Sequence, residues 1–169
     1  MARYAAFLRA LNVGGTSVIK MDVLRKQFEK LGFTDVKTVL ASGNVLFDAK
    51  GSAAAATKAI EGIGYTVCVR TAAEVRRIAE HDPFGGKDPD RLYIAFLEKE
   101  PSTDAVKKLL ALGTDQFHVD GMEAYWLRPR DAAQLPSGNV FEKILGVKST
   151  MRGVKTIRRI AAIFGDNQA

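Results

Sequence analysis

The chain reads Tyr4-Ala-Ala-Phe-Leu8 near its start and Tyr93-Ile-Ala-Phe-Leu97 in its second half, 89 residues later. Each stretch is a short apolar run between charged residues, which is typical of a buried strand. We therefore expect strands at Tyr4–Leu11 and Leu92–Leu97. Because the two runs are so similar, each is expected to open one copy of a repeated unit.

The similarity between the halves continues beyond this first strand. Leu-Gly-Phe-Thr-Asp at 31–35 returns as Leu-Gly-Thr-Asp at 112–115, and turn dipeptides stand at 42–43 and 120–121. The offset falls by 8 residues between the first strand and the first helix, so the first half carries extra residues, at Asn12–Lys20. Loops added to a rigid scaffold commonly carry function.

Hydrophobic periodicity and turn residues predict the elements of the first half. They are a strand at Tyr4–Leu11, a helix at Met21–Leu31, strands at Val36–Ala41 and Asn44–Asp48, a helix at Ser52–Glu61 and a strand at Tyr65–Arg70. The two middle strands are joined by Ser42-Gly43, a dipeptide typical of hairpin turns. This β-α-β-β-α-β order is that of a ferredoxin-like plait.

A helix, a linker and a second set of elements follow. Thr71-Ala-Ala-Glu74 has the spacing of a capping box and predicts a helix to about Glu80. Residues 81–90 contain several glycines and prolines and are predicted to form the linker. The later elements are a strand at Leu92–Leu97, a helix at Ser102–Leu112, strands at Asp115–Val119 and Met122–Leu127, a helix at Asn139–Leu145 and a helix at Val154–Phe164.

These elements predict an α+β fold of two tandem ferredoxin-like (βαββαβ-type) subdomains, the second incomplete or ending in helices. We expect the first subdomain at residues 1–80, a linker at 81–90 and the second subdomain at 91–169.

Composition is ordinary for a globular protein of 169 residues, with 47% hydrophobic and 26% charged residues, and excludes disorder. The net charge of +6 is distributed unevenly. Residues 1–80 carry +5, residues 81–140 carry −3 and residues 141–169 carry +4. Basic flanks favour an anionic partner, but the acidic middle argues against one polyanion groove along the whole chain.

The single cysteine and the two histidines limit the chemistry. Cys68 alone cannot form an intramolecular disulfide, and together with His81 and His118 it leaves too few ligands for a structural zinc site. Both histidines are expected to be structural or exposed, and Cys68 lies in a predicted strand with no base assigned beside it. We expect a cytoplasmic protein without metal, cofactor or membrane span.

The loop Asn12-Val-Gly-Gly-Thr-Ser-Val-Ile-Lys20 is the first candidate binding site. Gly14 and Gly15 allow backbone N–H groups to converge, and Lys20 adds a cation at the start of a helix, so the loop suits phosphate or another anion. It lacks the Gly-Lys-Ser/Thr ending of a Walker loop. The alternative is a long surface turn in which the glycines serve conformation alone.

Arg9, Ser42 and Asn44 are candidates near this loop. Arg9 precedes the loop and could offer a guanidinium, although pairing with Glu98, its counterpart in the repeat, is an equal alternative. Ser42 and Asn44 could offer a hydroxyl and an amide, but a tight turn whose glycine supplies positive φ also explains this stretch.

The stretch from Lys148 to Arg159 is the densest basic region. Arg152, Lys155 and Arg159 have helical spacing and are predicted to share one helix face, where Arg152 and Lys155 could bind an anion. The alternative is a solvated face opposite the apolar stripe.

Three functional classes stay open. The first is a binding module for a small phosphorylated or other anionic ligand. The second is a low-specificity nucleic-acid-binding protein, although the predicted strand Asn44-Val-Leu-Phe-Asp48 lacks the signature of RNA readers of this fold. The third is an enzyme acting on a phosphoester, for which the sequence indicates no catalytic group. The oligomeric state is not indicated.

Several motifs together resemble a known family. They are Phe7-Leu-Arg-Ala-Leu-Asn-Val-Gly-Gly15, Ile19-Lys-Met21, Leu31-Gly-Phe33, Ser42-Gly-Asn-Val45 and Asp82-Pro-Phe84, with a fainter echo at Thr150-Met-Arg152. The chain resembles the uncharacterised bacterial family filed as domain of unknown function 1697. The resemblance implies two ferredoxin-like subdomains and no established activity.

The resemblance also bears on individual residues. It favours a functional role for the loop and turn residues Arg9, Asn12, Gly14, Gly15, Lys20, Ser42 and Asn44. Where the family usually has Leu-Arg-Gly-Ile-Asn, this chain has Ala10 and Leu11 in place of the Gly and the Ile. Where the family has Gln-Ser-Gly-Asn, this chain has Ala41 in place of the Gln. Its Arg-Asn-Trp reads Arg-Gly-Val at 152–154, which argues against a role of that Asn and Trp in this chain.

Overall fold

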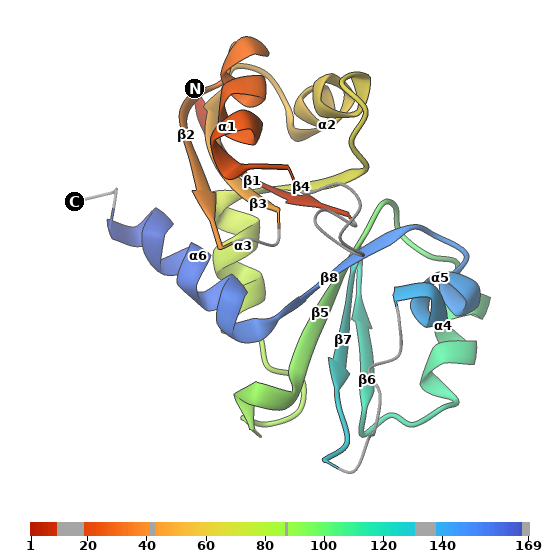
Figure 1. Cartoon of the computed structure of the whole chain (residues 1–169). Coiled ribbons are helices and arrows are strands. Elements are labelled where there is room, and N and C mark those ends of the chain that lie inside the picture. The colour runs from red at the N-terminus through yellow and green to blue at the C-terminus, as the bar shows by residue number, and fades with distance from the viewer. Residues whose placement is uncertain (10–18, 41–42, 87, 131–137, 167–169) are drawn as a thin grey trace. The chain divides into compact units, whose positions relative to one another are not determined.

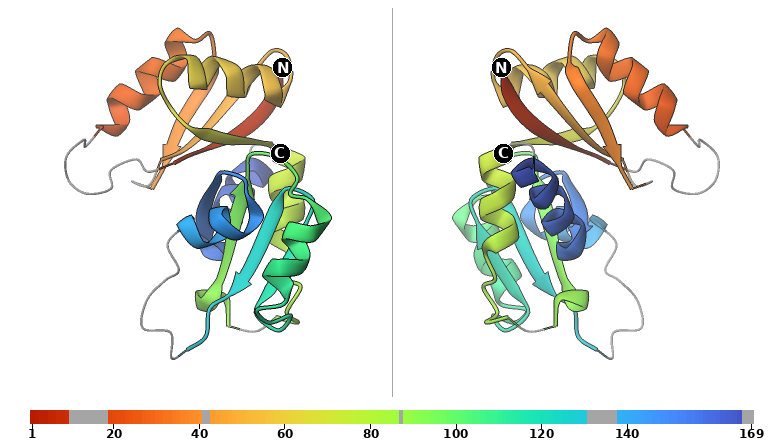
Figure 2. Two further views of the ribbon diagram at one scale, coloured as in Figure 1. Left: turned by 90° about the vertical axis from the view of Figure 1, so that its right-hand side faces the viewer. Right: turned by 90° about the vertical axis from the view of Figure 1, so that its left-hand side faces the viewer.

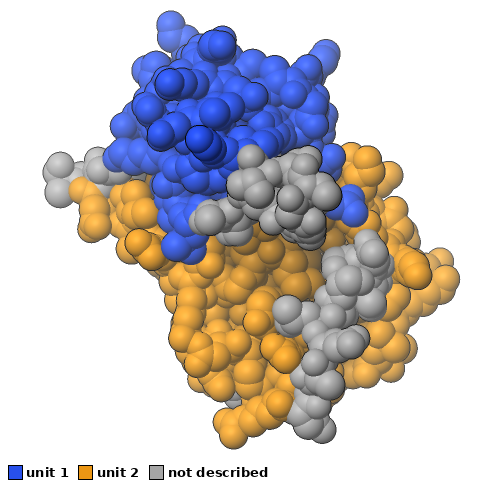
Figure 3. Space-filling view, in the orientation of Figure 1, with its two compact units in different colours: residues 1–76 blue, residues 77–169 orange. Residues whose placement is uncertain are grey.

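The computed structural model describes residues 1–9, 19–40, 43–86, 88–130 and 138–166 (Figure 1). Within these ranges the protein is α+β, with two four-stranded antiparallel sheets and six α-helices. The chain divides into two compact units, which we call unit 1 (Met1–Arg76) and unit 2 (Arg77–Ala169) (Figure 3). The predicted site residues Asn12, Gly14, Gly15 and Ser42 lie outside the described residues.

Unit 1 places two helices on one face of its sheet. Its elements are β1 (Ala2–Leu8), α1 (Met21–Lys30), β2 (Thr34–Val39), β3 (Asn44–Ala49), α2 (Ala53–Gly62) and β4 (Val67–Thr71). The strand order is β2-β3-β1-β4, and every neighbouring pair is antiparallel. Figure 2 shows α1 and α2 on the same side of this sheet.

Aromatic side chains form the centre of the unit 1 core. The ring of Phe47 on β3 stacks on Phe33 with centroids 4.4 Å apart and also contacts Phe28 and Tyr4. Phe28 belongs to the buried stripe of α1, as the apolar spacing predicts, and α1 is followed by Gly32 with φ of 92°. Packing of these rings fixes α1 on the sheet.

α3 (Ala72–Glu80) follows β4 and confirms the predicted capping box. The backbone N–H of Thr71 donates to Oε2 of Glu74 at 2.8 Å, and the N–H of Glu74 donates to Oγ1 of Thr71 at 3.1 Å. The boundary between the two units falls between Arg76 and Arg77, inside this helix, whereas the sequence predicted a linker at 81–90.

Unit 2 has the same order of strands and helices, with one helix added at its end. Its elements are the 3-10 helix η1 (Pro89–Arg91), β5 (Leu92–Leu97), α4 (Thr103–Leu110), β6 (Phe117–Asp120), β7 (Glu123–Leu127), α5 (Gly138–Leu145), β8 (Ser149–Gly153) and α6 (Val154–Asp166). The strand order is β6-β7-β5-β8. Trp126, Phe117 and Phe141 centre the core between the sheet and α4 and α5.

Equivalent backbone hydrogen bonds relate the two sheets. The N–H of Arg9 donates to the carbonyl of Thr66 at 2.9 Å, and the N–H of Glu98 donates to the carbonyl of Lys148 at 2.9 Å. Each bond joins the residue directly after the first strand of a unit to the residue directly before its fourth strand. Arg9 and Glu98 therefore occupy equivalent positions, as the repeat predicts.

β8 is the main difference from the predicted elements. The second subdomain was expected to be incomplete or to end in helices; it has a complete four-stranded sheet, and it ends in α6. The prediction that Arg152 shares a helix face with Lys155 is wrong, because Arg152 lies in β8 opposite Ile94 and α6 begins only at Val154. Pairing with β5 decides the conformation of this segment.

Candidate functional site

One end of unit 1 gathers the described members of the predicted binding site. β1 ends at Leu8, β3 begins at Asn44 beside Phe7, and the N–H of Leu8 donates to the carbonyl of Gly43 at 2.9 Å. α1 begins at Met21, at this same end of the sheet (Figure 2). We call the described residues at this edge, namely Arg9, Lys20, Gly43 and Asn44, the loop end of unit 1.

Lys20 is exposed and takes the N-cap position of α1. Its carbonyl accepts the N–H groups of Val23 and Leu24 at 3.0 and 3.1 Å, and its side chain makes no capping hydrogen bond. The start of the helix therefore carries positive electrostatic potential with an ammonium group beside it. Asp22 in the first turn offsets part of this potential.

Arg9 and Asn44 differ in accessibility. Arg9 is half-buried directly after β1, where its backbone is held by the bond to Thr66. Asn44 is 0% exposed, and its Nδ2 donates to the carbonyl of Val39 at 2.9 Å across the β2–β3 hairpin. Gly43 has φ of 85°, which confirms the expected turn glycine. The Asn44 side chain therefore stabilises the hairpin from within.

The two predicted residues of the basic tail lie on different elements. Arg152 is part of β8, and its Nη1 donates to the carbonyl of Met151 at 2.9 Å. Lys155 is exposed on α6 and forms an ion pair with Asp90. The hydrogen bond to Asp90 and the negative charge of that carboxylate raise the pKa of Lys155. An exposed pair of this kind contributes little to stability.

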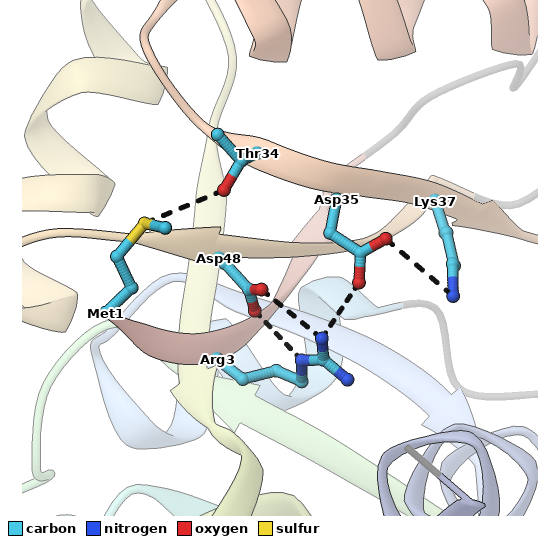
Figure 4. A network of polar contacts seen from close by, with 6 residues as sticks. All are labelled: Met1, Arg3, Thr34, Asp35, Lys37 and Asp48. Carbon is cyan, nitrogen blue, oxygen red and sulfur yellow. Dashed lines mark hydrogen bonds and ion pairs between the residues drawn. The ribbon is translucent and has the colours of Figure 1, made fainter.

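Charged residues on β1, β2 and β3 form a network that the sequence analysis did not single out (Figure 4). Nε of Arg3 lies 2.8 Å from Oδ1 of Asp48, and its Nη2 lies 2.8 Å from Oδ2 of Asp35. The hydrogen bond with Asp48 raises the pKa of the Arg3 guanidinium. Asp35 adopts φ of 48° and also lies 3.9 Å from Lys37. These ion pairs link side chains of three strands.

A second polar cluster lies in unit 2, among residues that the sequence analysis expected to be structural or exposed. His81, directly after α3, contacts the rings of His118 on β6 and Tyr125 on β7. Burial raises the pKa of the Tyr125 hydroxyl above its usual value, and the negative charge of Glu123 adds to this effect. No sequence signal connects these residues, because strand register and the end of α3 bring them together.

The described residues contain neither a cluster of metal ligands nor a membrane-spanning helix. No group of three or more His, Cys, Asp and Glu side chains within them is placed to hold a metal ion. In the same ranges, every helix is too short or too polar to cross a membrane. Cys68 is buried in β4.

Comparisons with known proteins identify the family. A solved structure, that of the conserved bacterial protein SP0830 from Streptococcus pneumoniae, matches with a TM-score of 0.66 at 19% sequence identity and covers 95% of this chain and 97% of that chain. At this identity the likeness concerns the fold alone. A comparison with curated proteins gives no match. Residues 1–125 match the family described as "Protein of unknown function (DUF1697)", and the chain belongs to that family.

Proposed function

We propose that the protein is a binding module for a small phosphorylated or other anionic ligand, which it holds at the loop end of unit 1. One observation carries this proposal: the end of β1, the start of α1 and the start of β3 meet at the same edge of the sheet. Arg9 and Lys20 therefore flank the segment that carries Gly14 and Gly15. Helix starts and glycine-rich turns are common anion-binding elements.

Each proposed residue has a separate role. Lys20 and Arg9 supply positive charge, and Gly14 and Gly15 supply backbone N–H donors. Ser42 supplies a hydroxyl from the adjacent turn. Asn44 fixes the hairpin through its bond to Val39 instead of contacting the ligand, since its side chain is buried.

The proposal includes the finer description of the fold. We infer that the chain contains two ferredoxin-like subdomains that arose by duplication, at residues 1–80 and 91–169 with a linker at 81–90, in a cytoplasmic protein. The matching strand orders and the equivalent bonds at Arg9 and Glu98 support this duplication.

Low-specificity nucleic-acid binding has less support, because Arg152 and Lys155 do not share a helix face.

A thermal-shift screen tests the binding proposal. Inorganic phosphate, pyrophosphate and nucleoside phosphates are compared on the wild type and on Lys20→Ala and Gly15→Val. Lys30→Ala is the matched control, because Lys30 is also exposed on α1 but lies in its last turn. Stabilisation by at least one compound should weaken in Lys20→Ala and Gly15→Val and persist in Lys30→Ala. Equal responses of the two lysine variants, or no stabilisation of the wild type, would overturn the proposal.

A further inference from the structure

The only two histidines of the chain meet in unit 2. His81 follows α3, and its N–H donates to the carbonyl of Arg77 at 3.1 Å. His118 lies on β6 directly opposite Tyr125 on β7. The ring centroids of the two histidines are 5.6 Å apart, and that of Tyr125 lies 5.1 Å from His81 and 6.0 Å from His118. Three aromatic rings with polar atoms therefore form one triangle, the His–Tyr cluster.

The His–Tyr cluster occupies the sheet face away from α4 and α5. Phe117, Ala124 and Trp126, the sequence neighbours of His118 and Tyr125 on β6 and β7, belong to the core on the helix side. Successive side chains of a strand point to opposite faces, so His118 and Tyr125 point away from that core. His81 approaches them on that opposite face.

Two polar atoms of the cluster are buried and have no hydrogen-bond partner within the described part of the chain. They are Oη of Tyr125, a residue that is 0% exposed, and Nε2 of His81. Buried polar atoms without a protein partner are uncommon, and a bound water or ion is one explanation for them. Both histidine residues are half-buried.

The surrounding charges favour a cation as the occupant. The Glu123 side chain is only 4% exposed, and its Oε1 lies 3.0 Å from Nη2 of Arg77. Asp120, 3.4 Å from Nη1 of the same guanidinium, adds a second carboxylate. Arg77 therefore faces two carboxylates, whereas Arg152 on β8 adds a positive charge to the same sheet face, on the other side of Ile94 from Tyr125. Directly beside Glu123 and Asp120 an anion is disfavoured.

We propose that His81 and His118 form an open binding site for a divalent transition-metal ion. Their imidazole nitrogens supply two ligands, water supplies the others, and the Tyr125 hydroxyl donates a hydrogen bond to that water. This is not the closed four-ligand zinc site that the composition excludes. Two imidazoles on one ion, each with a metal–nitrogen distance of about 2.0–2.1 Å, have ring centroids roughly 5 Å apart, close to the observed 5.6 Å.

The ligand chemistry also predicts a metal preference. Imidazole suits Cu²⁺, Ni²⁺ and Zn²⁺, and affinity should be highest for Cu²⁺. Mg²⁺, which prefers oxygen ligands, should not bind.

Calorimetric titration of the full chain without a histidine tag tests this proposal, with Cu²⁺, Ni²⁺, Zn²⁺ and Mg²⁺ as probes. His81→Asn and His118→Asn should each abolish saturable binding. Tyr125→Phe, which removes an outer hydrogen bond, should weaken binding roughly tenfold. Asp104→Asn, an exposed change in the first turn of α4, is the control and should bind like the wild type.

A spectroscopic measurement and a folding control complete the test. Electron paramagnetic resonance of the Cu²⁺ complex should show two nitrogen ligands in the wild type, and folded His118→Asn should not form this complex. Circular dichroism without metal establishes that each variant is folded. If His81→Asn does not fold, the His118→Asn variant decides the outcome. No saturable binding by the wild type, unchanged affinity in folded His118→Asn, or fewer than two nitrogen ligands would overturn the site.

Discussion

Leu46 on β3 of unit 1 and Tyr125 on β7 of unit 2 occupy equivalent sheet positions. Leu46 lies two residues after Asn44, which is opposite Phe7. Tyr125 likewise lies two residues after Glu123, which is opposite Phe96. Lys37, opposite Leu46, correspondingly matches His118. An apolar and a cationic side chain in one unit thus replace a phenol and an imidazole in the other. The strand order is the same in both units, so side chains on this sheet face can change without altering the fold.

One pair of side chains on that face is the same in both units. Arg70 on β4 lies opposite Ala5, and Arg152 on β8 lies opposite Ile94, the equivalent position. Nη1 of each arginine donates to the carbonyl of the preceding residue, at 3.1 Å in Arg70 and 2.9 Å in Arg152. The comparison separates the side chains that the two units share from those in which they differ.

The largest expected effect concerns the two equivalent core positions Phe47 and Trp126. Both are almost fully buried, and each contacts other aromatic rings, including Phe33 in unit 1 and Phe141 in unit 2. Phe47→Ala and Trp126→Ala should each lower the free energy of unfolding by about 3–5 kcal/mol, measured by urea denaturation. Phe47→Leu, which retains most of the apolar volume, should cost less. A loss below about 1 kcal/mol at either position would contradict the equivalence of the two cores.

A smaller effect should distinguish the ion pairs of the two units. Arg77→Met leaves the buried Glu123 carboxylate with one partner fewer and should cost about 1–3 kcal/mol. Arg3→Met leaves Asp35 and Asp48, which water can reach, and should cost about 0.2–1 kcal/mol. Urea denaturation measures both variants. Adding Glu123→Gln should recover part of the loss in Arg77→Met, and a larger effect at Arg3 would reverse the ranking.

The helix caps should give equal effects in the two units. Oγ of Ser52 accepts the N–H of Ala55 at 3.1 Å, and Oγ of Ser102 accepts the N–H of Ala105 at 3.2 Å. Ser52→Ala and Ser102→Ala should each lower the free energy of unfolding by about 1 kcal/mol in the same assay. Threonine at either position should retain most of the stability. Caps that differ by more than about 1 kcal/mol would show that the local bond does not dominate.

The smallest effect at neutral pH is expected for Tyr125→Phe. The variant removes a buried hydroxyl that has no partner among the described residues, so its stability should change by less than about 1 kcal/mol. Because burial raises the pKa of Tyr125 in the folded state, the unfolded chain loses this proton first, and the wild type should lose stability as the pH rises above about 10. Unfolding in urea at pH 7 to 11 measures this.

The comparison variant for this pH dependence is Tyr65→Phe. Burial also raises the pKa of Tyr65, although the hydrogen bond to Gln27 partly opposes this effect. Tyr65→Phe should therefore remove less of the stability loss at high pH than Tyr125→Phe does. Identical pH profiles of the wild type and Tyr125→Phe would contradict the role of Tyr125.

Local interactions explain which elements the sequence predicts well. The capping box at Thr71 and Glu74 predicts the start of α3, because both of its hydrogen bonds lie within one turn. β8 was not predicted, because the spacing of basic residues from Arg152 into α6 is typical of a helix. Its strand conformation depends instead on pairing with β5, between Leu97 and Ser149 and between Ile94 and Arg152.

The candidate sites show the same limit. Arg9 and Lys20 could be assigned to one edge from the strand–loop–helix order alone. The burial of Asn44 could not, because it depends on the pairing of β3 with both β1 and β2. The meeting of His81 and His118 depends on strand register and on where α3 ends, and neither has a signal in the sequence around these residues.

The position of the unit boundary inside α3 determines how the units can be studied as recombinant fragments. A fragment that ends at Arg76 retains the cap formed by Thr71 and Glu74 but loses the last turn of the helix. A fragment that begins at Arg77 loses the cap and keeps the guanidinium that pairs with Glu123. Fragments for separate expression should therefore overlap, each with residues 71–81, so that both contain the complete helix and its flanking residues.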